Sequence, residues 1–159
     1  MRSREYTFGT TLIEMVIVIA VIALLVSMVI GITSHIDKSS KEKGLNNIFT
    51  LLGSALQEYY EYTDKFPEQP EKNFTNAAVH SELLLTELRS IPNSRKVLEQ
   101  ISDLFLKNKA GANDTSPEIY DPWGTVLDYR YVQGDTFPEL ISAGPDKVFD
   151  TTDDISSKK

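Results

Sequence analysis

Two groups of carboxylates in this sequence could do chemistry. Glu14 stands at the start of an apolar run, because residues 15–30 contain no charged side chain and only one polar one, Ser27. A carboxylate at that depth in a bilayer is costly unless it is paired or protonated, and such residues are usually functional. Near the other end, four aspartates lie within nine residues: Asp146, Asp150, Asp153 and Asp154. Their spacing is not that of an EF-hand, so composition alone leaves open a calcium site or a solvated acidic tail.

No other group of residues indicates catalysis. The sequence has neither a glycine-rich phosphate loop nor a nucleophile elbow. The two histidines, His35 and His80, have no metal-ligating neighbour at i+3 or i+4, and we expect them at the surface or at a helix end. The absence of cysteine excludes disulfides and thiolate zinc sites, and a net charge of −7 argues against nucleic acid as a partner. We therefore expect a protein that is not an enzyme.

The apolar run around Glu14 is long enough to cross a membrane. Residues 11–32 number about 22, close to the roughly 20 that span a bilayer as a helix. Arg2 and Arg4 precede the run, and basic residues hold that end of a span in the cytoplasm. A secretory signal peptide would need a small-residue cleavage site after the run, and residues 31–36 are a poor one. Periodicity alone leaves a plain membrane anchor open.

The helical pattern continues beyond the apolar run. Apolar residues from Leu45 to Tyr60 recur at i, i+3, i+4 and i+7, which is typical of a helix with one buried stripe. We therefore predict a single helix over 10–62, ended before Pro67. Its first half is apolar all round and requires lipid or other helices as its surroundings. Its second half must cover a small domain.

Two shorter helices are predicted in the middle of the chain, over 77–89 and 94–108. The second is expected to start at Asn93 or Ser94 as its cap and to end before Gly111. Its predicted buried stripe is Val97, Leu98, Ile101, Leu104 and Phe105. Neither helix shows a functional site.

The last part of the chain predicts a short antiparallel sheet. Asp121-Pro122-Trp123-Gly124 has the residues of a type I turn. A strand over 126–132 places Leu127, Tyr129 and Tyr131 on one face and Asp128 and Arg130 on the other, and 137–142 is the returning strand. The fold class is therefore α+β, with the long helix packed by its C-terminal half on short helices and this sheet.

The residues Gly9-Thr10-Thr11-Leu12-Ile13-Glu14-Met15 resemble the class III signal of type IV pilins and pseudopilins. The resemblance implies that a prepilin peptidase cleaves between Gly9 and Thr10 and that Glu14 is the fifth residue of the mature chain. The first mature residue in that family is usually an N-methylated phenylalanine, where this chain has Thr10. The resemblance also implies that Glu14 meets the terminal amine of a neighbouring subunit during filament assembly.

The end of the chain resembles the major pseudopilin of type II secretion. The resemblance rests on the turn at 121–124, the strand pair, and the closing segments Ser142-Ala143-Gly144-Pro145-Asp146 and Asp153-Asp154-Ile155. It implies a calcium site in this loop. The implied ligands are Asp146, one or both of Asp153 and Asp154, and the carbonyl of Ala143, while Asp150 has no clear counterpart.

These expectations give a domain plan and a function. We expect a leader over 1–9, a transmembrane and filament-core helix over 10–33, and a periplasmic pilin-like domain over 34–159, with a variable helical region at 67–116 and the sheet and acidic loop at 117–159. The resemblance implies a subunit of a helical homo-oligomer in the bacterial inner membrane, single-pass with a cytoplasmic N-terminus. Its expected partners are prepilin peptidase, minor pseudopilins and the inner-membrane assembly platform. The alternatives are a type IV pilin or minor pilin in adhesion, motility or DNA uptake, and a membrane-tethered binding module that does not polymerise.

Overall fold

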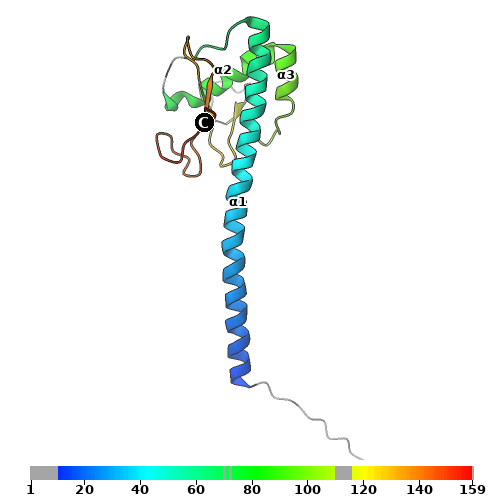
Figure 1. The fold of residues 1–159 in the computed structure, drawn as a ribbon, viewed down its shortest axis with the longest axis vertical. Helices are drawn as coiled ribbons and strands as arrows, with labels where there is room; N and C mark the ends of the chain where they lie inside the picture. Colours follow the sequence, from blue (N-terminus) through cyan, green and yellow to red (C-terminus); the bar gives the residue numbers. More distant parts are fainter. Residues whose placement is uncertain (1–10, 70, 72, 110–115, 159) are drawn as a thin grey trace, which may run out of the picture. The chain divides into compact units, whose positions relative to one another are not determined.

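The computed structural model describes residues 11–69, 71, 73–109 and 116–158, without the side chains of 28–36. The chain divides into two compact units between Ser40 and Lys41. Helix α1 (Leu12–Thr63, 52 residues) contributes to both units, which confirms the predicted long helix (Figure 1).

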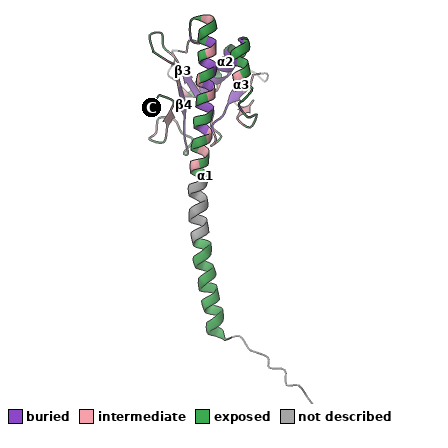
Figure 2. Ribbon diagram, turned by 45° about the vertical axis from the view of Figure 1, so that its right-hand side comes forward, coloured by how far each residue is buried: buried purple, intermediate pink, exposed green. Residues whose placement is uncertain are grey.

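In the first unit, α1 carries apolar side chains on every face. Their exposed fractions run from 83% at Leu12 to 51% at Val26, and Figure 2 shows this stretch as continuously exposed. Among the residues that the structure describes, no helix is both long enough and apolar enough to qualify as a membrane span. The predicted span is therefore not confirmed.

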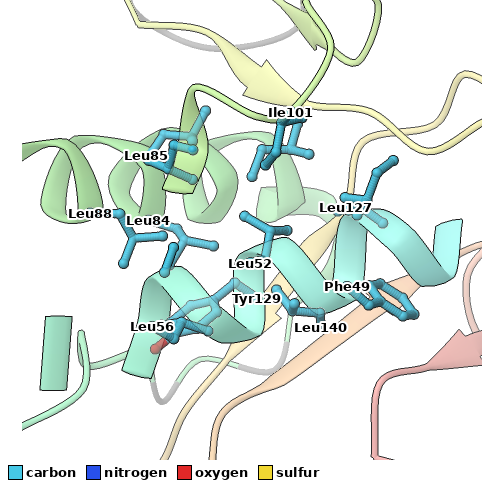
Figure 3. Close-up of a cluster of buried hydrophobic side chains, with 14 of the residues drawn as sticks. Phe49, Leu52, Leu56, Leu84, Leu85, Leu88, Ile101, Leu127, Tyr129 and Leu140 are labelled. Carbon is cyan, nitrogen blue, oxygen red and sulfur yellow. The ribbon is translucent and has the colours of Figure 1, made fainter. Parts of the chain in front are cut away.

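The second unit is built around the C-terminal part of α1. One stripe of this helix is buried, at Leu45, Ile48, Leu52, Ala55, Leu56 and Tyr59. It packs against Leu84, Leu85 and Leu88 from α2 (Ala77–Ser90) and against two strand residues, Tyr129 and Leu140 (Figure 3). The i, i+3, i+4 spacing of the stripe explains why a single face of the helix can supply this core.

Two short helices follow α1. A 3₁₀ turn, η1 (Phe74–Asn76), leads into α2, whose bounds agree with the predicted helix over 77–89. The next helix, α3 (Pro92–Leu98), starts with Pro92 in its first turn and Ile91 as the cap, so the predicted cap at Asn93 or Ser94 is wrong. Proline suits the first helical turn because its missing N–H has no intrahelical partner there.

The prediction that this helix reaches Asn108 is also wrong. After Leu98 the chain runs through turns into β1 (Leu106–Lys107), which pairs antiparallel with β2 (Glu118–Ile119). The predicted stripe is broken accordingly, because Ile101 is buried and Leu104 is 74% exposed. Pairing with a strand that lies later in the chain overrode the local helical spacing. The expected end of the helix at Gly111 lies outside the described residues.

A three-stranded antiparallel sheet closes the unit. Its order is β3 (Asp128–Arg130), β4 (Glu139–Ser142) and β5 (Ile155–Ser156). Tyr129 lies opposite Leu140 in the β3–β4 register, which confirms the predicted strand pair. The third strand, β5, was not predicted. It brings the end of the chain alongside β4 and so fixes both ends of the acidic loop.

Candidate functional site

Glu14 lies in the first turn of α1, where it helps to cap the helix. The backbone N–H of Thr11 donates to Glu14 Oε2 at 3.0 Å, and the Glu14 N–H donates to Thr11 Oγ1 at 3.4 Å. This reciprocal pair is a capping box, which satisfies two N–H groups that have no partner within the helix. The Thr-x-x-Glu spacing is the signal in the sequence that predicts such a cap. The implied cleavage residues, Gly9 and Thr10, lie outside the described residues.

Beyond Glu14, the one polar side chain of the apolar run forms its hydrogen bond within the helix. Ser27 Oγ donates to the Leu24 carbonyl at 2.8 Å, within the same helix. The described side chains around it are apolar and more than half exposed. A helix of this kind needs apolar surroundings from outside its own chain, because its surface offers water no polar face.

The turn at Asp121 holds the start of the acidic loop. Gly124 N–H donates to the Asp121 carbonyl at 3.0 Å, which confirms the predicted turn. Asp121 Oδ1 accepts from the N–H groups of Trp123 and Thr125, and Oδ2 accepts from Ser142 Oγ at 2.7 Å. Asp121 and Ser142 are both buried. Both oxygens of this carboxylate therefore accept hydrogen bonds from donors of the chain itself.

The acidic loop is closed by a tight approach between its two ends. Ser142 Oγ accepts from Gly144 N–H at 3.0 Å. A side chain at Gly144 would meet the Asp153 carbonyl oxygen at 2.1 Å, and Gly144 has a φ of +67°. Only glycine fits this position, because any Cβ would collide with backbone and the positive φ is strained for other residues. The loop between Gly144 and Asp153 is therefore pinned at both ends.

Inside the loop, Asp154 lacks a partner for one oxygen. Its Oδ2 accepts from Asp150 N–H at 2.9 Å, while its Oδ1 is buried without a hydrogen-bond partner among the described residues. Burial raises the pKa of Asp154, and the carboxylates of Asp150 and Asp146 raise it further. Asp146 Oδ1 accepts from Val148 N–H at 3.0 Å. The loop thus gathers three mutually repelling carboxylates around an unpartnered oxygen.

These oxygens could serve a hard cation, since calcium takes carboxylate and carbonyl ligands. Within the described ranges, however, no group of three or more His, Cys, Asp or Glu side chains is arranged to hold a metal ion. Of the implied ligands, Asp153 places its backbone carbonyl against Gly144, and Ala143 is fully buried.

Aromatic side chains fix the loop to the rest of the unit. Phe149, from the middle of the loop, stacks on Phe74 of η1 with ring centroids 4.4 Å apart. The guanidinium of Arg130 lies 4.1 Å from the centroid of the Phe74 ring. No local pattern predicts this contact, because the three residues are far apart in the chain.

His80 lies near the start of α2, one of the two expected positions, but it is buried there. It is 2% exposed, and its Nδ1 lies 2.7 Å from Oδ1 of Asp128, which is itself completely buried. The face of β3 that carries Asp128 is therefore covered by α2 rather than by solvent. Sequence spacing cannot reveal this pair, since 48 residues separate its members.

The chain is similar to a known protein of the type II secretion system. It is 30% identical over 160 residues to the type II secretion system core protein G of Escherichia coli (strain K12), a match that covers 99% of this chain and 94% of that protein. A crystal structure of the major pseudopilin from the type 2 secretion system of enterohaemorrhagic Escherichia coli aligns with a TM-score of 0.40 at 20% identity, over 78% of this chain and 87% of that one. No protein-family profile matches the chain.

Proposed function

Because this chain belongs to the pseudopilins of the type IV pilin-like superfamily, we propose that it is a structural subunit of a periplasmic pseudopilus that supports type II protein secretion. The proposed location is the bacterial inner membrane, with a single pass and a periplasmic C-terminal part. The proposed partners are further copies of the chain in a helical filament, minor pseudopilins, the inner-membrane assembly platform and prepilin peptidase.

One observation carries the proposal beyond family membership. The first part of α1 exposes apolar side chains on every face, each by more than half of its surface. Burial stabilises apolar surface by about 25 cal/mol per Å², so a helix of this composition is stable only in lipid or among other helices. A subunit that moves from membrane to filament core meets both environments in turn.

Glu14 is the proposed register residue of the filament. After cleavage between Gly9 and Thr10, the new amine of Thr10 is a positive charge that Glu14 of a neighbouring subunit can pair with. The capping box with Thr11 supplies the carboxylate with partners while the subunit is still alone. During assembly, Glu14 would exchange part of its hydrogen bonding with Thr11 for an ion pair with the Thr10 amine of a neighbouring subunit. This pair would form at only one axial position of the two subunits.

Two substitutions at Glu14 separate the charge from the cap. Glutamine can still close a capping box, so Glu14→Gln removes the charge alone, whereas Glu14→Leu removes both. We expect both variants to insert in the membrane and to yield at least about tenfold fewer filaments, because breaking a buried ion pair costs about 3–5 kcal/mol. Glu61→Leu, at an exposed position farther along α1, is the matched control.

The measurement is the yield of sheared filaments from cells, with the secreted fraction of an exported protein as the second reading. Normal filaments from Glu14→Gln would show that the carboxylate charge has no register role. Absence of filaments from the unaltered chain, with unchanged secretion in cells that lack it, would contradict the proposed assembly function itself.

The processing step has its own test. The mass of the membrane-extracted protein should correspond to a chain that starts at Thr10, with or without one methyl group. The protein from cells that lack prepilin peptidase should keep Met1. A mature chain that starts beyond residue 32 would instead indicate an ordinary secretory signal.

We also propose that the acidic loop binds calcium. The support is the unpartnered Asp154 Oδ1, the repulsion among the nearby carboxylates, and the pinning of the loop ends at Gly144 and Asp153. The proposed ligands are Asp146, Asp153, Asp154 and the carbonyl of Ala143, and Asp150 is the weakest candidate. A bound cation would cancel the repulsion and hold the tail against the sheet.

Calorimetry on the full chain in detergent tests the calcium site. We expect saturable binding and a higher melting temperature in calcium, both lost in Asp146→Ala and Asp154→Asn. Asp103→Asn changes an exposed aspartate outside the loop and should leave the calcium effect intact. Absence of binding at millimolar calcium would mean that the loop is only an acidic tail, without affecting the proposed assembly role.

A further inference from the structure

A cavity of about 290 Å³ lies in the second unit, and none of its lining residues belongs to the acidic loop. Four parts of the chain line it: the end of α1, the segment 65–69 that follows it, one face of α2, and Tyr129 of β3. The α2 face presents His80, Leu83, Leu84 and Glu87, which follow the i, i+3, i+4, i+7 spacing. The assembly role uses none of these residues.

The buried histidine that lines this cavity has a nitrogen without a partner. His80 Nδ1 contacts Oδ1 of Asp128 at 2.7 Å, and the other oxygen of Asp128 accepts from Arg130 Nε at 3.0 Å. A carboxylate paired with arginine can only accept, so Nδ1 is the donor of this bond, and Nε2 is the remaining polar atom of the ring. Nε2 is buried and has no hydrogen-bond partner among the described residues.

Two hydroxyl groups of the cavity already donate to acceptors of the chain. Tyr59 Oη donates to Glu87 Oε2 at 2.8 Å, and Tyr129 Oη donates to the Pro67 carbonyl at 2.8 Å. Burial and the bond to Glu87 raise the pKa of Tyr59 to about 12, so its proton stays in place at neutral pH. Both hydroxyl protons are therefore already used, and a ligand must bring its own donors.

The charge around the cavity is predominantly negative. Glu68 and Glu87 line it together with a single cation, Lys65. Glu71 adds a third carboxylate, with Oε2 at 3.7 Å from His80 Nε2. Hydrogen bonds from the amides of Asn76 and Asn73 lower the pKa of Glu71, so that it is charged at neutral pH. Acceptors, carboxylates and aromatic rings together form the environment that proteins use to bind a cationic side chain.

We propose that this cavity binds the arginine or lysine side chain of a protein partner. The aromatic rings of Tyr59, Phe66 and Tyr129 line the space for its aliphatic stem and cationic head. The carboxylates of Glu87 and Glu68 receive its N–H donors, and the ring of His80 lines the same space. Exposed apolar side chains at the rim, Leu83 at 53% and its helix neighbour Val79 at 39%, supply a docking surface for the rest of the partner. The cavity therefore predicts the chemistry of the partner's side chain. This proposal does not depend on the proposed filament assembly.

The test compares two small probes on the full chain in detergent. N-acetyl-arginine amide carries the guanidinium, and N-acetyl-citrulline amide has nearly the same shape without the charge. We expect the arginine probe to bind and to shift the His80 side-chain nitrogen resonances. The citrulline probe should bind at least about tenfold more weakly, because charge-assisted hydrogen bonds are roughly twice as strong as neutral ones.

Two variants and a control complete the experiment. Glu87→Gln keeps an acceptor for Tyr59 but removes the charge, and Glu68→Gln removes a second carboxylate without touching α2. Each should weaken the arginine probe several-fold, whereas Glu99→Gln, at an exposed position outside the cavity, should not. Equal binding of both probes, no binding of either, or full affinity in both variants would overturn the proposal.

Discussion

The two parts of α1 share one continuous backbone but differ in what surrounds their side chains. In the first part, every described large apolar side chain is at least 51% exposed. In the second part, the stripe from Leu45 to Tyr59 is no more than 9% exposed. The difference arises from the pattern alone, because the first part has no polar face and the second has one. The continuity of a helix therefore does not indicate whether its side chains pack within their own chain or against other molecules.

The carboxylates repeat this contrast on a smaller scale. Asp121 directs both oxygens to donors of its own unit, whereas one buried oxygen of Asp154 has no hydrogen-bond partner among the described residues. The hydrogen bonds of Asp121 are complete in the isolated chain. The unpartnered oxygen of Asp154 can take a ligand from outside the chain, which is why we propose a cation site there.

The largest expected effect tests the two parts of α1 directly. Leu52→Ala creates a cavity in the core and should lower the free energy of unfolding of the second unit by about 2–5 kcal/mol. Leu25→Ala, in the exposed part of the same helix, should change it by less than about 0.5 kcal/mol. Trp123, the only tryptophan, packs against this core and reports unfolding by its fluorescence. Equal effects would show that the first part is also packed within the isolated chain.

The second prediction concerns Asp121, whose two carboxylate oxygens both accept hydrogen bonds. Asp121→Ala leaves the Ser142 hydroxyl and two backbone N–H groups without their acceptor, and should destabilise the unit by about 2–3 kcal/mol. The loss should be the same with and without calcium. The exposed Asp103→Ala is the control, since its side chain is outside this network. A loss that calcium restores would mean that the turn and the acidic loop form a single cation-dependent site.

The third prediction uses the phenol at the end of α1. Tyr59→Phe should cost about 1 kcal/mol at neutral pH, because it removes the bond to Glu87. The pKa of Tyr59 is raised from 10.0 to about 12, so the folded state holds the proton more tightly. This stability is fully present below pH 10 and is lost between pH 10 and 12. Denaturant unfolding should show a smaller alkaline loss in Tyr59→Phe, whereas Tyr62→Phe, 74% exposed, should behave as the parent.

The smallest expected effect concerns Asp154, whose Oδ1 has no hydrogen-bond partner among the described residues. The pKa of Asp154 is raised above 3.8, so its ionised form destabilises the fold, and this cost grows as pH rises through the raised pKa. Asp154→Asn should therefore stabilise the calcium-free chain at pH 7 by less than about 1 kcal/mol. The gain should disappear near pH 3 and reverse in calcium. Asp135→Asn, which contacts Lys158 at the surface, should show no such gain.

Local patterns were enough to predict much of this structure. Spacings of a few residues predict the extent of α1, the position of α2, the turn at Asp121 and the β3–β4 pair. The helix predicted over 94–108 failed because its second half pairs with β2 instead. A strand that lies beyond residue 115 competes for those residues, and no local pattern contains it.

The sequence by itself determined that one helix would have an apolar surface all round in its first part and a single buried stripe in its second. It also determined that carboxylates would gather near the end of the chain. Only the tertiary structure decided which polar groups find partners. His80 is buried on Asp128, Ser142 connects the turn at Asp121 to Gly144, and Asp154 is left with an unpartnered oxygen. The reason is physical: helix and turn formation depend on neighbours a few residues away, whereas burial and hydrogen bonding of a side chain depend on segments that meet only after folding.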